Sequence, residues 1–285
     1  MFKNKSMKSH LIAVSVVIMA IALLSGCEDV IDLNVNEAAP RLVIEAVILD
    51  RPSPYAYVLI TKSMGPFLAE DLTMVSDAEV IISDDAGNVD TLTEYQPGVY
   101  LTPDIEAAAG RSYTASVTVE GETYTSTSVM PEAIEIDSIG FEYQEGGGFG
   151  DDDEEGYILH VFFSDRPEIE DYARIKLMQN DSLWERFYLY NGIYSDSKAI
   201  DYDSYEDVFD YGDSVFIELY TIDGTSYEYF EALSFVAIYE DGTDTEGVPG
   251  NPYTNWDKDV LGYFGAFTLR QESIIVDSTM ATILP

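Results

Sequence analysis

The side chains best suited to contact a ligand or a partner are tyrosines, which gather in the final third of the 285-residue chain. Twelve of the 21 tyrosines lie between residues 188 and 263, and between 188 and 213 they alternate with aspartates. Tyrosine offers a large contact area at low entropic cost, and aromatic rings beside carboxylates suit sugars or cationic ligands. The alternative is that these side chains face a sheet or cover a solvated loop. The candidate contact residues are Tyr194, Tyr202, Tyr205, Tyr211 and Trp256.

Catalytic chemistry has little support in this sequence. The chain has two histidines and one cysteine. His160 lies in an apolar run, residues 157–163, where strand alternation puts it on one face with Ile158 and Phe162. This pattern is typical of a histidine in a core or on a sheet face. Glycoside hydrolysis needs only two carboxylates, but 53 acidic residues supply many pairs and nothing distinguishes one of them. We therefore predict that the protein is not an enzyme.

Two acidic clusters contain the hard oxygen ligands that Ca²⁺ prefers. One is residues 151–155, and the other is the set of acidic residues between 201 and 210. Neither fits the EF-hand pattern, because position 205 is Tyr and no Gly follows it. Solvated acidic loops are the interpretation that we favour. No metal and no cofactor is expected, with calcium at these loops as the alternative.

The charge and composition exclude several classes of protein. The chain has 14 basic and 53 acidic residues, a net charge of -39. Nucleic acid is excluded as a partner, because its phosphates need basic residues to neutralise them. One cysteine cannot form an internal disulfide. A content of 46% hydrophobic and 13% aromatic residues is typical of a folded chain rather than of an acidic disordered one.

The first 26 residues have the pattern of a lipoprotein signal peptide. Lysines precede an apolar run from Leu11 to Leu24, and Leu-Ser-Gly-Cys follows. The run is shorter than the roughly 20 residues that a membrane span needs. The tetrad resembles the bacterial lipobox, which implies that Cys27 is lipidated and becomes the new N-terminus. Residues 27–40 would then be a lipidated tether. The alternative is an uncleaved N-terminal anchor with a fortuitous cysteine.

Three acidic residues, Glu28, Asp29 and Asp32, follow the cysteine closely. In lipoproteins of Bacteroidota, such a cluster resembles the signal for export to the outer leaflet of the outer membrane. The alternative is the ordinary acidity of the chain. We expect a protein that several acyl chains hold stably in the outer membrane, exposed at the cell surface.

The rest of the chain is predicted to be mainly β. Short strands rich in β-branched residues and separated by turn signals indicate an immunoglobulin-like β-sandwich at 41–130. The clearest hairpin joins 112–119 to 123–129 across Gly121, with one strand face formed by Tyr113, Ala115, Val117 and Val119.

A second β-rich domain is predicted at 131–285. Its expected strands are 157–163, 173–178, 183–190, 215–222, 262–269 and 273–276, with a long excursion at 191–214. One helix is predicted near 226–240. It would start with a capping box from Thr225 to Glu228 and present an apolar face of Tyr227, Phe230, Leu233, Ser234 and Ala237.

Several segments together carry a family resemblance. They are the lipobox with its acidic start, the strand at 40–48, the hairpin region at 110–139 and the segment at 250–268. The last is the most specific, with an Asn-Pro-x-x-Asn turn before a Gly-Tyr-Phe-Gly-Ala strand. In these features the chain resembles the Bacteroidota outer-membrane lipoprotein family catalogued as domain of unknown function 4249, over nearly the whole mature length.

Members of that family are typically encoded beside TonB-dependent outer-membrane transporters, some of the starch-utilisation type. The resemblance implies an accessory or ligand-binding subunit of a nutrient transporter. Its partners would be that transporter, the lipid bilayer through Cys27, and a nutrient whose class stays open among sugar, peptide and metal chelate. The alternative is a surface adhesion or protein-interaction module. The family has no established catalytic residues to carry over.

Overall fold

The computed structural model describes residues 39–51, 56–63, 72–102, 104–145, 155–166, 169–184, 186–194, 199–204, 208–239 and 251–277. The chain divides into two compact units, Met1–Ala39 and Pro40–Pro285, and the elements below belong to the second. Several predicted features lie outside the described residues, namely the signal peptide, Cys27, Glu28, Asp29, Asp32, residues 151–154 and Tyr205.

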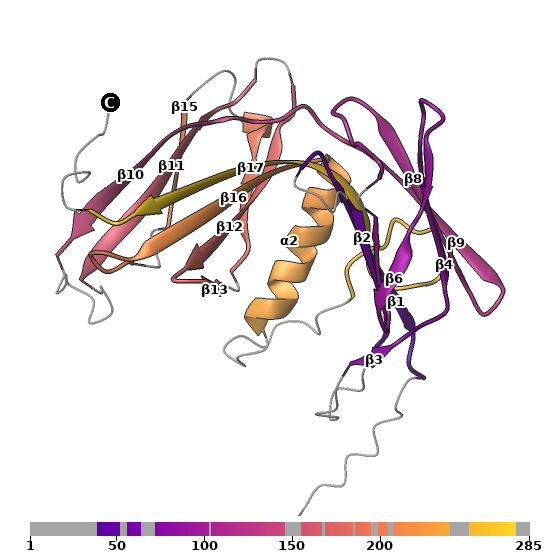
Figure 1. Ribbon diagram of the computed structural model, residues 1–285. Coiled ribbons are helices and arrows are strands. Elements are labelled where there is room, and N and C mark those ends of the chain that lie inside the picture. Colours follow the sequence, from indigo (N-terminus) through magenta and orange to yellow (C-terminus); the bar gives the residue numbers. More distant parts are fainter. Residues whose placement is uncertain are drawn as a thin grey trace, which may run out of the picture. The chain divides into compact units, whose positions relative to one another are not determined.

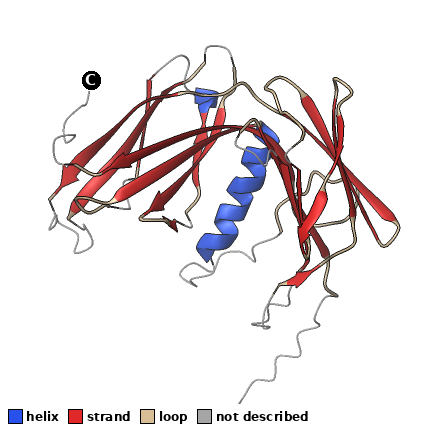
Figure 2. Cartoon of the chain, viewed as in Figure 1, coloured by secondary structure: helices blue, strands red, loops and turns tan. Residues whose placement is uncertain are grey.

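The described chain is mainly β with one α-helix, as predicted, and its strands form three sheets (Figure 1, Figure 2). The largest has ten strands, in the order β13 (Ser182–Leu183), β12 (Tyr172–Gln179), β16 (Ser214–Ile222), β17 (Phe264–Ile275), β1 (Leu42–Leu49), β2 (Ala56–Lys62), β7 (Val99–Thr102) and β6 (Thr93–Gln96), with β14 (Tyr188–Asn191) on β12 and β3 (Thr73–Met74) on β2. A four-stranded sheet has the order β5 (Val89–Thr91), β4 (Glu79–Asp84), β8 (Ser112–Val119) and β9 (Glu122–Val129). A three-stranded sheet has the order β10 (Ile136–Gln144), β11 (Gly156–Ser164) and β15 (Ala199–Asp203).

The ten-stranded sheet joins the two ends of the chain. Strand β17 pairs in parallel with β1, with Ala46 opposite Phe264 and Leu49 opposite Phe267. On its other edge β17 pairs antiparallel with β16. The sheet therefore continues across the predicted boundary at residues 130–131.

Alternation along the strands gives this sheet two different faces. Side chains of β1 and β2 on one face, such as Ile44 and Val58, share a core with Val80 and Tyr113 of the four-stranded sheet. This arrangement is the predicted β-sandwich, and the residues of β8 expected to face inward are all buried. Farther along the same sheet, β12 and β16 share a second core with β11 of the three-stranded sheet. The helix lies on the opposite face of the ten-stranded sheet.

The helix α2 spans Gly224–Tyr239 and lies beside β12 and β14. The predicted capping box is wrong, because Asp223 caps the helix: its Oδ1 accepts a hydrogen bond of 2.7 Å from the backbone N–H of Ser226. Asp223 Oδ2 also accepts from the hydroxyl of Ser128 at 2.9 Å, which fixes the start of the helix against β9. No helix in the described part of the chain is long and apolar enough to cross a membrane.

Some predicted strands differ from the observed ones. The run at 183–190 is two short strands, β13 and β14, that both pair with β12. The two predicted C-terminal strands are one continuous strand, β17. The predicted excursion at 191–214 contains a strand, β15, which pairs with β11. Each of these differences depends on pairing with a strand that is distant in the sequence, and local composition does not identify that strand.

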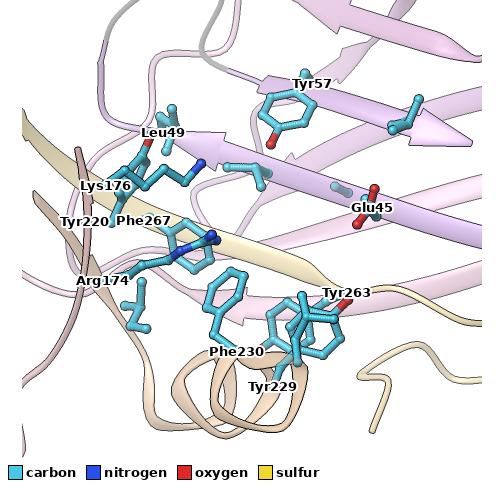
Figure 3. Close-up of a pocket in the computed structure, with 15 residues that line it drawn as sticks. Glu45, Leu49, Tyr57, Arg174, Lys176, Tyr220, Tyr229, Phe230, Tyr263 and Phe267 are labelled. Carbon is cyan, nitrogen blue, oxygen red and sulfur yellow. The ribbon is translucent and has the colours of Figure 1, made fainter. Parts of the chain in front are cut away.

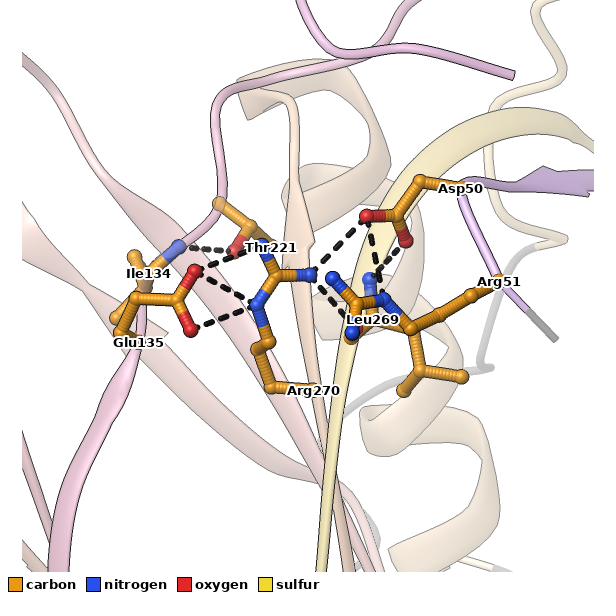
Figure 4. Close-up of polar contacts among 7 residues, drawn as sticks. All are labelled: Asp50, Arg51, Ile134, Glu135, Thr221, Leu269 and Arg270. Carbon is orange, nitrogen blue, oxygen red and sulfur yellow. Dashed lines mark hydrogen bonds and ion pairs between the residues drawn. The ribbon is translucent and has the colours of Figure 1, made fainter. Parts of the chain in front are cut away.

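An ion network ties the connector between the two smaller sheets to β1 and β17 (Figure 4). Arg270 Nε donates to the carboxylate of Glu135 at 2.7 Å, and its Nη1 donates to Asp50 Oδ2 at 3.0 Å. The side chains of Arg270 and Asp50 are mostly buried, at 17% and 14% exposed. Asp50 also accepts from the backbone N–H of Leu269 at 2.7 Å. Arg270 thus offsets the charge of two carboxylates, of which Asp50 is mostly buried and Glu135 is exposed.

Replacing Arg270 is expected to destabilise the fold measurably. Arg270→Met keeps the apolar stem but leaves Asp50 with only the more distant and more exposed Arg51, whose Nε is 3.7 Å from Asp50 Oδ2, and we expect a loss of about 1–3 kcal/mol in the free energy of unfolding. Arg41→Met is the control, because Arg41 pairs with the exposed Asp259 and should cost about 0–1 kcal/mol. Chemical denaturation followed by circular dichroism measures both, and equal losses in the two variants would contradict the structural role of Arg270.

Candidate functional site

A cavity of about 290 Å³ lies between the ten-stranded sheet and α2 (Figure 3). It is lined by side chains of β1, β2, β12, β16, β17 and α2. We call it the sheet–helix cavity and define it by Glu45, Tyr57, Arg174, Lys176, Tyr220, Tyr229, Phe230, Tyr263 and Phe267, with their apolar neighbours. Its volume is close to the lower end of the range for small-molecule sites, about 300–1,000 Å³.

Strand alternation explains why these side chains meet. In β12 the buried residues Ala173, Ile175 and Leu177 point into the second core. Arg174 and Lys176, which stand between them, therefore point to the opposite face, toward α2. The same alternation on β1 buries Ile44 and Ala46 in the sandwich and turns Glu45, which stands between them, toward the cavity.

Two cations lie side by side in this cavity. The Arg174 guanidinium carbon is 4.3 Å from the ring centre of Phe230 and 4.8 Å from that of Phe187. Lys176 Nζ is 5.1 Å from the ring centre of Tyr220. No ion pair within 4 Å joins either cation to a carboxylate among the described residues, and Arg174 Nε is buried without a hydrogen-bond partner. Cation–π contacts with these rings stabilise both cations.

Burial has a consistent electrostatic effect on these groups. It lowers the pKa of Arg174 and of Lys176, and the neighbouring Arg174 lowers the pKa of Lys176 further. The carboxylate nearest Lys176 across the strands is Glu218, which accepts from the Tyr220 hydroxyl at 2.6 Å and from the Gln271 amide at 2.9 Å. The two positive charges are therefore only partly compensated by the protein.

The open side of the cavity carries one carboxylate and one phenol. Glu45 and Tyr57 are exposed to solvent, Tyr57 at 40%, so small molecules can enter. Even so, protein surrounds them on most sides, and burial raises the pKa of both groups. Figure 3 shows Glu45 and Tyr57 on the strands opposite Arg174 and Lys176.

Aromatic rings form the wall near the helix. Tyr229 of α2 stacks on Tyr263 at 4.8 Å between ring centres, and Phe230 packs against Phe267 at 6.1 Å. The Tyr263 hydroxyl bonds to Ser226 Oγ at 3.0 Å, beside the helix cap. Burial, with Glu45 adding to it, raises the pKa of Tyr229 to about 12, so this phenol is a neutral hydrogen-bonding group near pH 7.

Of the predicted contact tyrosines, Tyr202 and Tyr211 have described side chains, and the two differ in exposure. Tyr211 is 66% exposed, in the turn before β16. Tyr202 on β15 packs against the second core, edge to face with Tyr188 at 6.0 Å. Burial, with Asp203 adding to it, raises the pKa of Tyr202 to about 12. Tyr194 ends the short helix η1 (Gly192–Tyr194), and its side chain is outside the described residues.

The prediction that Trp256 contacts a ligand or partner is wrong. Trp256 is 5% exposed, and its Nε1–H donates to the backbone oxygen of Ile44 at 3.1 Å. Next to it, the Asn255 amide donates to and accepts from the backbone of Phe264 at 2.8 and 3.0 Å. Asp257 accepts from the backbone and hydroxyl of Thr125 at 2.8 and 2.7 Å. This specific segment joins β1, β9 and β17, so its role is structural.

His160 has the predicted place on a sheet face. It is 8% exposed, with Nδ1 at 2.8 Å from Asp201 Oδ1 and Nε2 at 3.6 Å from Glu142 Oε2. These carboxylates come from the two strands that flank β11. In the described part of the chain, no group of three or more His, Cys, Asp and Glu side chains is placed to hold a metal ion.

Local tyrosine density does not predict the cavity residues, because it selects tyrosines from the segment where they are most frequent. Tyr220, Tyr229 and Tyr263 belong to the tyrosine-rich third of the chain, but they lie outside its Asp-rich segment. A better signal was available in β12, where two of the few basic residues alternate with buried apolar ones. In an amphipathic strand, two cations at i and i+2 must share one face.

The chain matches a protein-family model over most of its length. A family model described as "Domain of unknown function (DUF4249)" matches residues 28–273. No curated protein matches the chain.

Similarity to solved structures is slight. A segment of two fibronectin type III domains from chicken tenascin is 11% identical, with 65% of this chain and 91% of that chain covered and a TM-score of 0.21. A pullulanase from Anoxybacillus sp. LM18-11, complexed with maltotriose, is 14% identical, with 62% and 24% covered and a TM-score of 0.20. The chicken interferon gamma receptor alpha chain is 7% identical, with 65% and 90% covered and a TM-score of 0.19. These TM-scores are too low to add to the description of the fold.

Proposed function

We propose, from the premise that this chain belongs to the DUF4249 family, that it is a ligand-binding accessory subunit of a TonB-dependent outer-membrane nutrient transporter. It is anchored in the outer membrane through lipidated Cys27 and faces the cell surface. It binds its ligand without catalysing a reaction. The lipobox-like tetrad, the acidic residues Glu28, Asp29 and Asp32, and the typical gene neighbourhood of the family support the location and the partner.

The observation that carries the ligand-binding role is the sheet–helix cavity. It is open to solvent, has walls of aromatic rings and contains two cations that form no ion pair within 4 Å to a described carboxylate. A small-molecule site is typically an apolar cavity with a few placed polar groups. A stalk or adhesion module has no need of such a cavity, so the structure favours a binding subunit over the adhesion alternative.

Affinity capture of a tagged copy from detergent-solubilised membranes tests the proposal. We expect an outer-membrane transporter of the TonB-dependent class to be recovered with the wild-type protein. The Cys27→Ala variant should be lost from the outer-membrane fraction, because it lacks the acyl chains that hold it there, and should recover little transporter. Recovery of no transporter by the wild-type protein, in extracts where the protein itself is abundant, would refute the proposed partner.

A further inference from the structure

We propose that the sheet–helix cavity binds a small organic anion, with its carboxylate on Arg174 and Lys176 and its planar apolar part on Phe230 and Phe267. This inference rests on the proposed ligand-binding role and specifies the class of ligand.

The charge balance of the cavity is the first argument. The protein has 53 acidic and 14 basic residues, so a basic side chain has many acidic groups available to pair with. Arg174 and Lys176 nevertheless lie together on one strand face without an ion pair to the described residues. Glu218, opposite Lys176 on β16, accepts hydrogen bonds from Tyr220 and Gln271 instead and offsets the two charges only in part. Two neighbouring cations, partly removed from water, are unfavourable alone. A bound carboxylate would offset that cost, and the same two charges disfavour a cationic ligand.

The geometry of Arg174 is the second argument. Phe187 and Phe230 contact its guanidinium within 5 Å, which restrains the plane of the group. Its Nε is buried and makes no hydrogen bond. A guanidinium restrained in this way is arranged to donate two parallel hydrogen bonds to a carboxylate. Lys176, two residues farther along the same strand face, adds the second positive charge.

The walls of the cavity indicate the chemistry of the part of the ligand beyond its carboxylate. Phe230 and Phe267 contact one another, and Tyr229 stacks on Tyr263 beside them. Rings in this arrangement pack well against a flat apolar group. The volume of about 290 Å³ limits the ligand to a small molecule. Glu45, at the open side, disfavours a second negative charge on the ligand near that side.

The test compares two probes that share a ring system and differ in charge, 2-naphthoate and 2-naphthamide. Isothermal titration calorimetry on the complete mature protein in detergent gives both affinities. We expect 2-naphthoate to bind about 10- to 100-fold more tightly, since hydrogen bonds to charged groups account for such ratios. In the double variant Arg174→Gln with Lys176→Gln, the two affinities should become equal.

Three further variants make the result specific. Lys62→Gln removes an exposed cation outside the cavity and should keep the preference for 2-naphthoate. Glu45→Gln removes the carboxylate at the open side and should strengthen 2-naphthoate binding. Lys176→Met should raise the melting temperature by about 2–4 °C, because a poorly compensated charge is gone, while it weakens 2-naphthoate binding. A rise in melting temperature therefore separates lost binding from unfolding.

The proposal is overturned by equal affinities of the wild-type protein for the two probes, or by a preference that persists in the double variant. It is also overturned if neither probe gives a binding heat, released or absorbed, up to its solubility limit. Transporter capture reads out the proposed function independently. A transporter recovered by a protein that shows no anion preference would mean that the ligand class alone is wrong.

Discussion

Gly262→Ala is expected to be among the most destabilising single substitutions in this protein. Gly262 has φ of +91°, and a Cβ at this position would collide with the backbone oxygen of Ile44 and lie 2.7 Å from its carbonyl carbon. The neighbouring Leu261 is hydrogen-bonded to β1 on both sides, at 2.9 Å to Leu42 and 2.9 Å from Ile44. Neither backbone can move without breaking this pairing. We expect a loss of at least about 3 kcal/mol, from left-handed strain and overpacking together.

Gly87→Ala is a matched control for this prediction. Gly87 has the same φ of +91°, but no atom lies within 4 Å of the position that a Cβ would take. It should therefore show only the cost of the left-handed conformation, about 1–2 kcal/mol. Chemical denaturation followed by circular dichroism compares the two variants. If Gly262→Ala costs no more than Gly87→Ala, the close packing of this segment on β1 is wrong.

Trp256→Ala is expected to cost about 3–5 kcal/mol, as large-to-small changes of buried aromatic residues do. Trp256 is in the sandwich core, near Phe264, and its Nε1–H satisfies the carbonyl of Ile44. The substitution would leave a cavity where β1 and β17 meet. It would also leave a buried carbonyl without its donor.

Two comparisons show whether Trp256 is structural. Trp256→Phe keeps most of the apolar contact and loses the hydrogen bond, so it should cost less, about 1–3 kcal/mol. Tyr211→Ala removes an aromatic residue that is 66% exposed and should change stability by less than about 0.5 kcal/mol. Thermal unfolding of the three variants gives this order. A Trp256→Ala variant as stable as Tyr211→Ala would restore the prediction of a surface contact.

The sandwich was predictable because its information is local. In β8, buried and polar residues alternate without interruption, and a Gly-centred turn joins β8 to β9. Such a pattern fixes which face is buried whatever the partner sheet is. The helix was predictable for the same reason. The residue that caps its first turn was not predictable, because Asp223 is held in place by a hydrogen bond from Ser128 on β9, a strand distant in the sequence.

The cavity was not predictable from any one segment. Its cations lie on β12, its carboxylate on β1 and its rings on α2 and β17, more than 200 residues apart at the extremes. Parallel pairing of β17 with β1 brings these elements together, and local sequence patterns do not record which strands become neighbours. The aromatic-rich third of the chain supplies Tyr220, Tyr229 and Tyr263 to the cavity. Which individual tyrosines are exposed cannot be read from the sequence, because exposure depends on the partner surface.

Composition and periodicity define the class of the protein: a thiol-poor, strongly acidic, mainly β chain with one helix, in which alternation decides the buried face of each long strand. Which of the remaining faces meet depends on the tertiary structure. The fold buries Trp256 in the sandwich and turns Arg174 and Lys176 toward α2, where neither forms an ion pair with a described carboxylate. The physical reason is that periodicity is a property of one strand, whereas a cavity is made by side chains from several strands that are distant in the chain.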